Sequence, residues 1–262
     1  MSREALKNLK RVVVKVGTST LTYENGKLNL RRIEQLVRVL SDLKNRGMEV
    51  ILVSSGAIGV GVGKLGLKHK PSITMEKQAA AAVGQCELMY LYDKMFSEYG
   101  YTTAQVLLTK DVIESKERKQ NVVNTFITLL KMDVVPVVNE NDAISVEEIE
   151  FGDNDTLSAI VATLTDAEGL VILTDIDGLY SENPKENPNA KLVSDVYEID
   201  DALKKTAGGA GSNRGTGGMI TKIMAAEIAK EAGIHTVVCN GADPKTLYSL
   251  FEGENVGTVF HA

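Results

Sequence analysis

Short apolar runs alternate with amphipathic stretches along the chain. The run at 11–16 is apolar except for Lys15 and ends at Gly17, which is typical of a strand buried on both faces. Between residues 31 and 46 apolar side chains recur at helical spacing, which predicts a helix. By the same criteria we expect further strands at 50–53, 103–108, 134–138, 170–173, 236–239 and 257–260, and further helices near 75–99, 116–132, 155–165 and 219–232.

This order of elements predicts an α/β fold with a mostly parallel central sheet sandwiched between layers of helices. Two segments interrupt the order. The stretch 145–151 alternates in polarity and is expected to be a surface hairpin, and the glycine-rich stretch 207–218 is expected to be flexible. Because no linker or repeat divides the chain, we expect a single domain over 1–262, in two functional halves that meet near residue 166.

Composition narrows the classes of function. A net charge of −6 and a pI of 5.3 give no general attraction for nucleic acid or for an anionic membrane. The chain has neither a leader pattern nor an apolar run of about 18 residues, so we expect a cytoplasmic protein. Cys86 and Cys239 lack disulfide or zinc spacing, and both are expected to be buried, reduced thiols.

Polar clusters follow most of the expected strands. Open α/β sheets bind ligands beyond the carboxyl ends of their strands, so these clusters are the candidate site. They are Lys15–Ser19, Ser54–Gly56, Asn139–Asp142 with Gly152–Asp155, Thr174–Asp175 with Gly178–Tyr180, and Gly215–Lys222.

Two of these clusters suggest binding of an anion. Lys15 lies among valines, where a buried ammonium needs an anionic partner or a bound phosphate; the alternative is that it extends to solvent. The glycines at 215–218 precede a helix whose first turn carries Lys222, so backbone N–H groups and a cation could hold phosphate. The alternative is a plain flexible loop, and the sequence is not a Walker A motif.

Other features have competing interpretations. The stretch Gly61–Gly66 matches G-x-G-x-x-G, but Ser54–Gly56 already occupies the strand-to-helix turn, which argues against a dinucleotide fold. The glycines between 56 and 66 are instead expected to let a helix or loop pack closely on a ligand. Any of the aspartates in the clusters could cap a helix, Asp153 and Asp155 above all.

The three histidines, at 69, 235 and 261, lie outside the clusters, so the chemistry should need no imidazole base. Two lysines, glycine-rich backbone and aspartates match phosphoryl transfer, in which the protein positions the reactants and neutralises charge. A carboxylate acceptor, with a pKa of about 4.3, is already ionised at neutral pH and needs no base. The set therefore favours a kinase that phosphorylates a carboxylate.

Six motifs in order carry a resemblance to a known family. They are Val14–Ser19, Ser54–Ile58, Val138–Ala143, Gly152–Asp155, Leu173–Asp175 with Gly178–Tyr180, and Gly215–Lys222. Together they resemble the glutamate 5-kinases of the amino acid kinase family, in a short form without a C-terminal PUA domain. The resemblance implies the three-layer fold of that family, ATP with Mg²⁺, and L-glutamate phosphorylated to L-glutamyl 5-phosphate in the first step of proline biosynthesis. It also implies feedback inhibition by proline and a homodimer or homotetramer.

The resemblance also assigns roles to individual residues. The catalytic residues would be Lys15, Lys222 and Asp155, and those that hold glutamate Ser55, Asp142 and Asn154. The nucleotide would contact Lys15, Gly17, Gly56, Thr174, Asp175, Thr216, Gly217, Gly218, Met219, Ile220, Thr221 and Lys222. The half at 1–166 would then bind glutamate and the half at 167–262 the nucleotide. No metal ligand is expected from the protein, since magnesium would arrive on the ATP phosphates.

Three alternatives remain open at this point. A kinase of the same fold could phosphorylate a nucleotide or an isoprenoid phosphate. An ATP-binding regulator without activity would be marked by a missing lysine, which this chain does not show. An interaction module would have no use for paired lysines at strand and helix ends.

Overall fold

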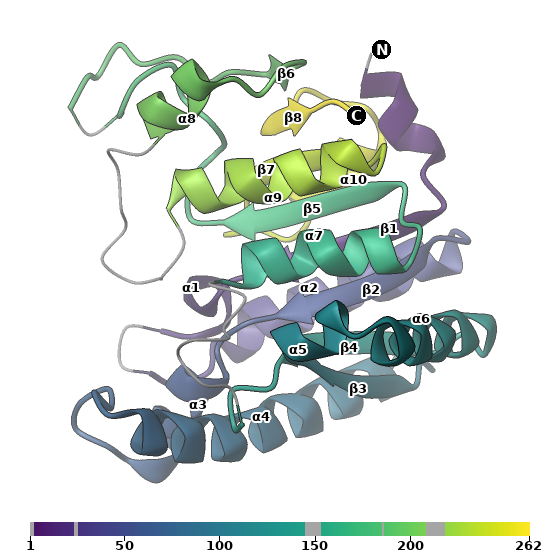
Figure 1. Ribbon diagram of the computed structural model, residues 1–262, viewed down its shortest axis with the longest axis vertical. Helices are drawn as coiled ribbons and strands as arrows, with labels where there is room; N and C mark the ends of the chain where they lie inside the picture. The colour runs from purple at the N-terminus through teal and green to yellow at the C-terminus, as the bar shows by residue number, and fades with distance from the viewer. Residues whose placement is uncertain (1–2, 24–25, 145–152, 185, 208–217) are drawn as a thin grey trace.

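The computed structural model describes residues 3–23, 26–144, 153–184, 186–207 and 218–262. The expected hairpin at 145–151 and nearly all of the glycine-rich stretch lie outside these residues. Within them the chain forms one eight-stranded sheet with helices on both faces (Figure 1). The strands are β1 (Arg11–Val16), β2 (Glu49–Ser54), β3 (Thr103–Leu108), β4 (Val135–Glu140), β5 (Gly169–Thr174), β6 (Asp195–Val196), β7 (His235–Asn240) and β8 (Thr258–Phe260).

The expected α/β sandwich with a mostly parallel sheet is confirmed. The strand order is β3-β4-β2-β1-β5-β7-β8-β6, and the pairings are parallel except for that between β7 and β8. Chain before residue 167 forms the block from β3 to β1, and later chain forms the block from β5 to β6. The central pair, β1 and β5, is therefore the seam between the two halves.

The helices match the main periodic segments of the sequence. They are η1 (Arg3–Asn8), α1 (Thr18–Leu21), α2 (Leu30–Asn45), α3 (Ala57–Leu65), α4 (Thr74–Ser97), α5 (Lys110–Glu114), α6 (Lys116–Lys131), α7 (Asn154–Leu164), α8 (Asp201–Ala207), α9 (Met219–Glu231) and α10 (Thr246–Phe251). The short ones, α1, α5, α8 and α10, span too few residues for a clear helical period.

Alternate residues of each strand face two separate cores. Val12, Val14 and Val16 pack with side chains of α2, α4 and α10 on one face of the sheet. Val13 packs with side chains of α6, α7 and α9 on the other face, and Lys15 has the same parity as Val13. The side chain of Lys15 is therefore directed to the layer that holds α7 and α9, which Figure 1 shows side by side in front of β1 and β5.

Two glycines let α3 and α4 touch through their backbones. A Cβ at Gly84 would lie 1.8 Å from the carbonyl oxygen of Ala57, and one at Gly61 would lie 1.8 Å from that of Ala80. The expectation that the glycines of 56–66 approach a ligand is therefore wrong for Gly61, which approaches another helix instead.

The cysteine expectation is only half right. Cys239 is buried in β7, and this burial raises the pKa of its thiol to about 12. Cys86, in α4, is exposed and lies at a cavity rather than in the packed core. An alanine-rich helix gives little sequence signal of which side faces the core.

Candidate active site

Four helices begin near the carboxyl ends of the central strands. Helix α1 follows β1 through Gly17, and α3 follows β2 through Gly56, whose φ of 102° suits glycine. Ser55 N donates to the carbonyl of Val16, which ties these two turns together. The N-termini of α7 and α9 lie at the same end of the sheet (Figure 1). This convergence creates a place where backbone N–H groups and helix dipoles favour an anion.

Lys15, Asp155 and Lys222 form a buried cluster of charges at this place. Lys15 Nζ lies 2.6 Å from Asp155 Oδ1, and Lys222 Nζ lies 3.0 Å from Asp155 Oδ2. The side chains are 10%, 0% and 6% exposed in the order Lys15, Asp155, Lys222. Because Lys15 comes from β1 and Lys222 from α9, the cluster bridges the two halves of the sheet.

The cluster holds two ammonium groups against one carboxylate. Burial raises the pKa of Asp155, but attraction to Lys15 and then to Lys222 outweighs it and leaves the pKa below its ordinary value. Asp155 is therefore ionised at neutral pH, and its place in the first turn of α7 adds the favourable helix dipole. Two ammonium groups held together at a buried site suit the binding of a phosphoryl group.

Asp153 and Asp155 have different roles, helix capping for one and ion pairing for the other, which the sequence alone did not distinguish. Asp153 is the N-cap of α7, and its carboxylate accepts a hydrogen bond from Thr156 N at 2.9 Å. Asp155 does not cap the helix. It accepts a further hydrogen bond from Thr221 Oγ1 at 2.9 Å, so the first turn of α9 is tied to the first turn of α7.

The residues expected to hold glutamate lie beside the charge cluster. Asn154, the neighbour of Asp155 in sequence, donates through Nδ2 to Ser55 Oγ at 2.8 Å and to Asn139 Oδ1 at 2.8 Å. Asn139 Nδ2 donates in turn to Gln85 Oε1 at 3.0 Å. The chain of amides thus joins α7, the turn after β2, β4 and α4.

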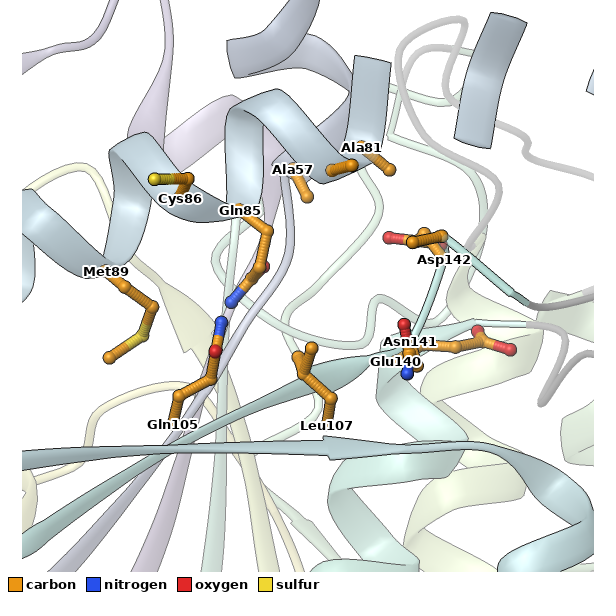
Figure 2. A pocket seen from close by; sticks show the side chains of 12 residues that line it. Ala57, Ala81, Gln85, Cys86, Met89, Gln105, Leu107, Glu140, Asn141 and Asp142 are labelled. Carbon is orange, nitrogen blue, oxygen red and sulfur yellow. The ribbon is translucent and has the colours of Figure 1, made fainter. Parts of the chain in front are cut away.

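Asp142 lines a cavity of about 320 Å³ between α4 and the ends of β3 and β4 (Figure 2). The cavity is also lined by Gln85, Cys86, Met89 and Glu140. Lys15, Asp155 and Lys222 are not among its lining residues, so the cavity does not contain the charge cluster. A small polar molecule in the part near Asp142 would have carboxylate and amide groups around it.

The structure describes most of the residues expected to bind the nucleotide. Thr174 and Asp175 follow β5 at the seam, and Thr174 Oγ1 donates to Asp175 Oδ1 at 3.2 Å. Gly218 is the N-cap of α9, and Met219, Ile220 and Thr221 form its first turn with Lys222 next. Thr216 and Gly217 lie outside the described residues.

The sequence does not single out Asn139 or Gln85 as individual site residues. Asn139 belongs to the polar cluster Asn139–Asp142, and its 2% exposure marks it as a buried amide that needs partners. Gln85 gave no signal, because a glutamine within a long alanine-rich helix is ordinary on a solvated face. Only the packing of α4 brings Gln85 to β4.

The described residues contain no group of three or more His, Cys, Asp or Glu side chains placed to hold a metal ion. A separate observation is that none of the helices described is both long and apolar enough to cross a membrane.

Comparison with known proteins places the chain among kinases. The model of the amino acid kinase family matches residues 10–240. A glutamate 5-kinase of Clostridium perfringens is 59% identical over 264 residues, an alignment that covers 99% of this chain and 98% of the relative. A glutamate 5-kinase of Clostridium acetobutylicum is 55% identical over 97% of this chain and 96% of its own length.

Solved structures agree on the fold. The isopentenyl phosphate kinase of T. acidophilum superimposes with a TM-score of 0.66 over 96% of this chain and 100% of that one, at 20% sequence identity. At that identity the likeness speaks for the fold alone. The family match and the near full-length identity to the two clostridial proteins show that this chain belongs to the amino acid kinase family, in its glutamate 5-kinase branch.

Proposed function

We propose that this protein is a kinase that transfers the γ-phosphoryl group of ATP to the side-chain carboxylate of L-glutamate. The product is L-glutamyl 5-phosphate, and the reaction is the first step of proline biosynthesis. The observation that carries the proposal is the 59% identity to a glutamate 5-kinase over 99% of the chain. The charge cluster of Lys15, Asp155 and Lys222 supports the same chemistry independently.

The reaction requires little proton transfer. An oxygen of the glutamate side chain forms a bond to the γ-phosphorus, the bond from that phosphorus to the bridging oxygen breaks, and ADP leaves with the electron pair. Lys15 and Lys222 neutralise charge on the phosphoryl oxygens in transit, and Asp155 holds both ammonium groups in place. Because the acceptor is already ionised, the absence of histidine from the described cluster fits the reaction.

The α-groups of glutamate would be held by Ser55, Asp142 and Asn154. Asp142 supplies a carboxylate for the α-ammonium through a charge-assisted hydrogen bond, and Ser55 with Asn154 supplies neutral polar groups next to the charge cluster. The side-chain carboxylate would then extend toward Lys15 and Lys222. This division puts glutamate on the 1–166 side of the seam.

The nucleotide would lie on the 167–262 side. Thr174, Asp175 and the first turn of α9 surround the carboxyl ends of β5 and β7, and Gly17 and Gly56 offer backbone without a side chain on the other side. Thr216 and Gly217 complete the proposed set. The two ammonium groups of the cluster fit ATP phosphates.

Magnesium is proposed to enter with the nucleotide. The described residues hold no group of three or more His, Cys, Asp or Glu side chains placed to hold a metal ion, and Mg²⁺ is commonly held largely by the phosphate oxygens of its nucleotide. Bound there, it neutralises charge on the phosphates.

Three further properties belong to the proposal. Proline would inhibit by competing for the glutamate pocket, since it shares an α-carboxylate and an α-nitrogen with glutamate. The protein would be cytoplasmic. It would assemble as a homodimer or homotetramer, and the outer side of α4, which carries exposed Met75 and Tyr90, is a surface suited to a second copy.

A panel of acceptors tests the proposal directly. The protein is incubated with ATP, magnesium and one acceptor at a time, and hydroxylamine traps any acyl phosphate as a hydroxamate. ADP release and hydroxamate formation with L-glutamate are expected. Turnover with UMP or isopentenyl phosphate and none with glutamate would instead favour a phosphate acceptor.

A further inference from the structure

Gln85 connects α4 to the end of β4. Its Oε1 accepts the hydrogen bond from Asn139 Nδ2 at 3.0 Å. Tyr92 lies seven residues later on the same side of α4, and its hydroxyl is 2.8 Å from Ser54 Oγ at the end of β2. One side of α4 therefore forms hydrogen bonds to the ends of two neighbouring strands. Of these two residues, Gln85 belongs to the amide network, which consists of Gln85, Asn139, Asn154 and Ser55.

Donors and acceptors follow one order along the amide network, from the nitrogen of one amide to the oxygen of the next group. A primary amide nitrogen only donates, and its carbonyl oxygen only accepts. Because Gln85 Oε1 accepts from Asn139 Nδ2, the oxygen of Asn139 is turned to Asn154 and accepts from Asn154 Nδ2. The second hydrogen on Asn154 Nδ2 goes to Ser55 Oγ. Each bond thus determines the orientation of the next amide.

This direction determines what Ser55 and Asn154 can offer a ligand. Ser55 Oγ accepts from Asn154, so its own hydrogen is left to be donated in another direction. Both hydrogens of Asn154 Nδ2 are used, and its Oδ1 can act only as an acceptor. An amino acid needs one group of each kind, a donor for its α-carboxylate and an acceptor for its α-ammonium.

We propose that Gln85 is a positioning residue that sets this direction, so that Ser55 serves as donor and Asn154 as acceptor toward the α-groups of the substrate. The inference rests on the proposed function, since it takes an amino acid as the ligand. Without an acceptor at position 85, the amide of Asn139 can turn by half a rotation. Its nitrogen would then face the nitrogen of Asn154 and exclude the bond that orients Asn154.

The substitution Gln85→Met removes the acceptor of the hydrogen bond from Asn139 and changes little else. It is unbranched and close to glutamine in length, and Gln85 lies at the wall of a cavity, so the change costs little packing. In full-length Gln85→Met we expect the KM for glutamate to rise about tenfold, the size of a lost hydrogen bond in a polar site. The KM for ATP and kcat should stay within about threefold, because the charge cluster is untouched.

A double-mutant cycle with Asn154→Ala separates positioning from general loss of structure. If Gln85 acts through Asn154, then Gln85→Met should change the glutamate KM by less than about twofold in the Asn154→Ala background. The matched control is Tyr92→Phe, which removes the bond to Ser54 from the same side of α4. It should lower the melting temperature and leave the glutamate KM within about twofold.

The outcomes are distinct. A wild-type enzyme that turns over glutamate, with a Gln85→Met variant of unchanged glutamate KM, overturns the role of Gln85 and leaves the proposed function standing. An equal rise of KM in the wild-type and Asn154→Ala backgrounds also overturns it, because the effect would not pass through Asn154. A wild-type protein without glutamate turnover overturns both proposals.

Discussion

Lys15 Nζ lies 2.6 Å from Asp155 Oδ1, although one residue belongs to β1 and the other to the first turn of α7. Asp155 has no exposed side-chain surface, and its other carboxylate oxygen forms an ion pair with Lys222 from α9. One carboxylate therefore balances two buried ammonium groups at the seam of the sheet. Both stability and turnover should depend on it.

Asp155→Asn should destabilise the fold by about 3–5 kcal/mol, because it leaves two buried ammonium groups without their carboxylate. Urea unfolding of the variant and the wild type measures the loss. Asp153→Asn is the matched control, since it removes a charge two residues away and keeps an N-cap acceptor; a change under about 0.5 kcal/mol is expected there. Equal losses in the two variants would contradict this role of Asp155.

The contribution of Asp155 should depend on pH in one direction. Its pKa in the folded protein is below the ordinary value, so its ionised form stabilises the fold above the unfolded pKa of about 3.9. That stabilisation is lost as the pH falls below about 4 toward the folded pKa. The difference in unfolding free energy between the wild type and Asp155→Asn should be constant from pH 5 to 7 and shrink in more acid solution. A difference that shrinks on going from pH 5 to 7 would have the wrong sign.

Lys222→Ala should lower kcat roughly a hundredfold or more, because one donor to transition-state charge is typically worth about 3 kcal/mol. Steady-state assays with saturating glutamate and ATP measure it. Lys230→Ala is a control on the same helix, since Lys230 Nζ donates to the carbonyl of His261 away from the cluster. Unchanged turnover in a folded Lys222→Ala variant would remove Lys222 from the mechanism.

Asp142→Asn should raise the glutamate KM strongly and reduce the preference for glutamate over glutarate. Glutarate offers no ammonium to that carboxylate, and sites built to bond a substrate group reject analogues that lack it. ATP affinity should change little, since the proposed nucleotide contacts lie at 174–222. A fold-stabilising role would show itself differently, as a lower melting temperature with equally weakened ATP binding.

Proline should inhibit competitively with glutamate. Initial rates are measured at low and high glutamate over a range of proline concentrations, and high glutamate should restore the rate. Rates at low glutamate that do not respond to saturating proline would show that the protein lacks this control. Inhibition that persists at saturating glutamate would place proline at another site.

The strand and helix order could be predicted because buried parallel strands and amphipathic helices leave local patterns. The apolar run at 11–16, which forms β1, predicted a buried strand, and Lys15 within that run predicted an anionic partner. Motifs at strand ends identified the candidate site because parallel strands bring their carboxyl ends together. These conclusions follow from residues that are close in sequence or from one general rule of topology.

Other features depend on contacts between distant segments. Only the packing of α4 brings Gln85 to Asn139, and only the touching backbones of α3 and α4 explain Gly61 and Gly84. The exposure of Cys86 and the antiparallel pairing of β8 likewise depend on which elements happen to be neighbours. The sequence by itself determined the alternation of elements and the chemistry available at strand ends, because both are local. The tertiary structure decided which polar groups are partners, because hydrogen bonds and close backbone contacts depend on distances in space that sequence spacing does not record.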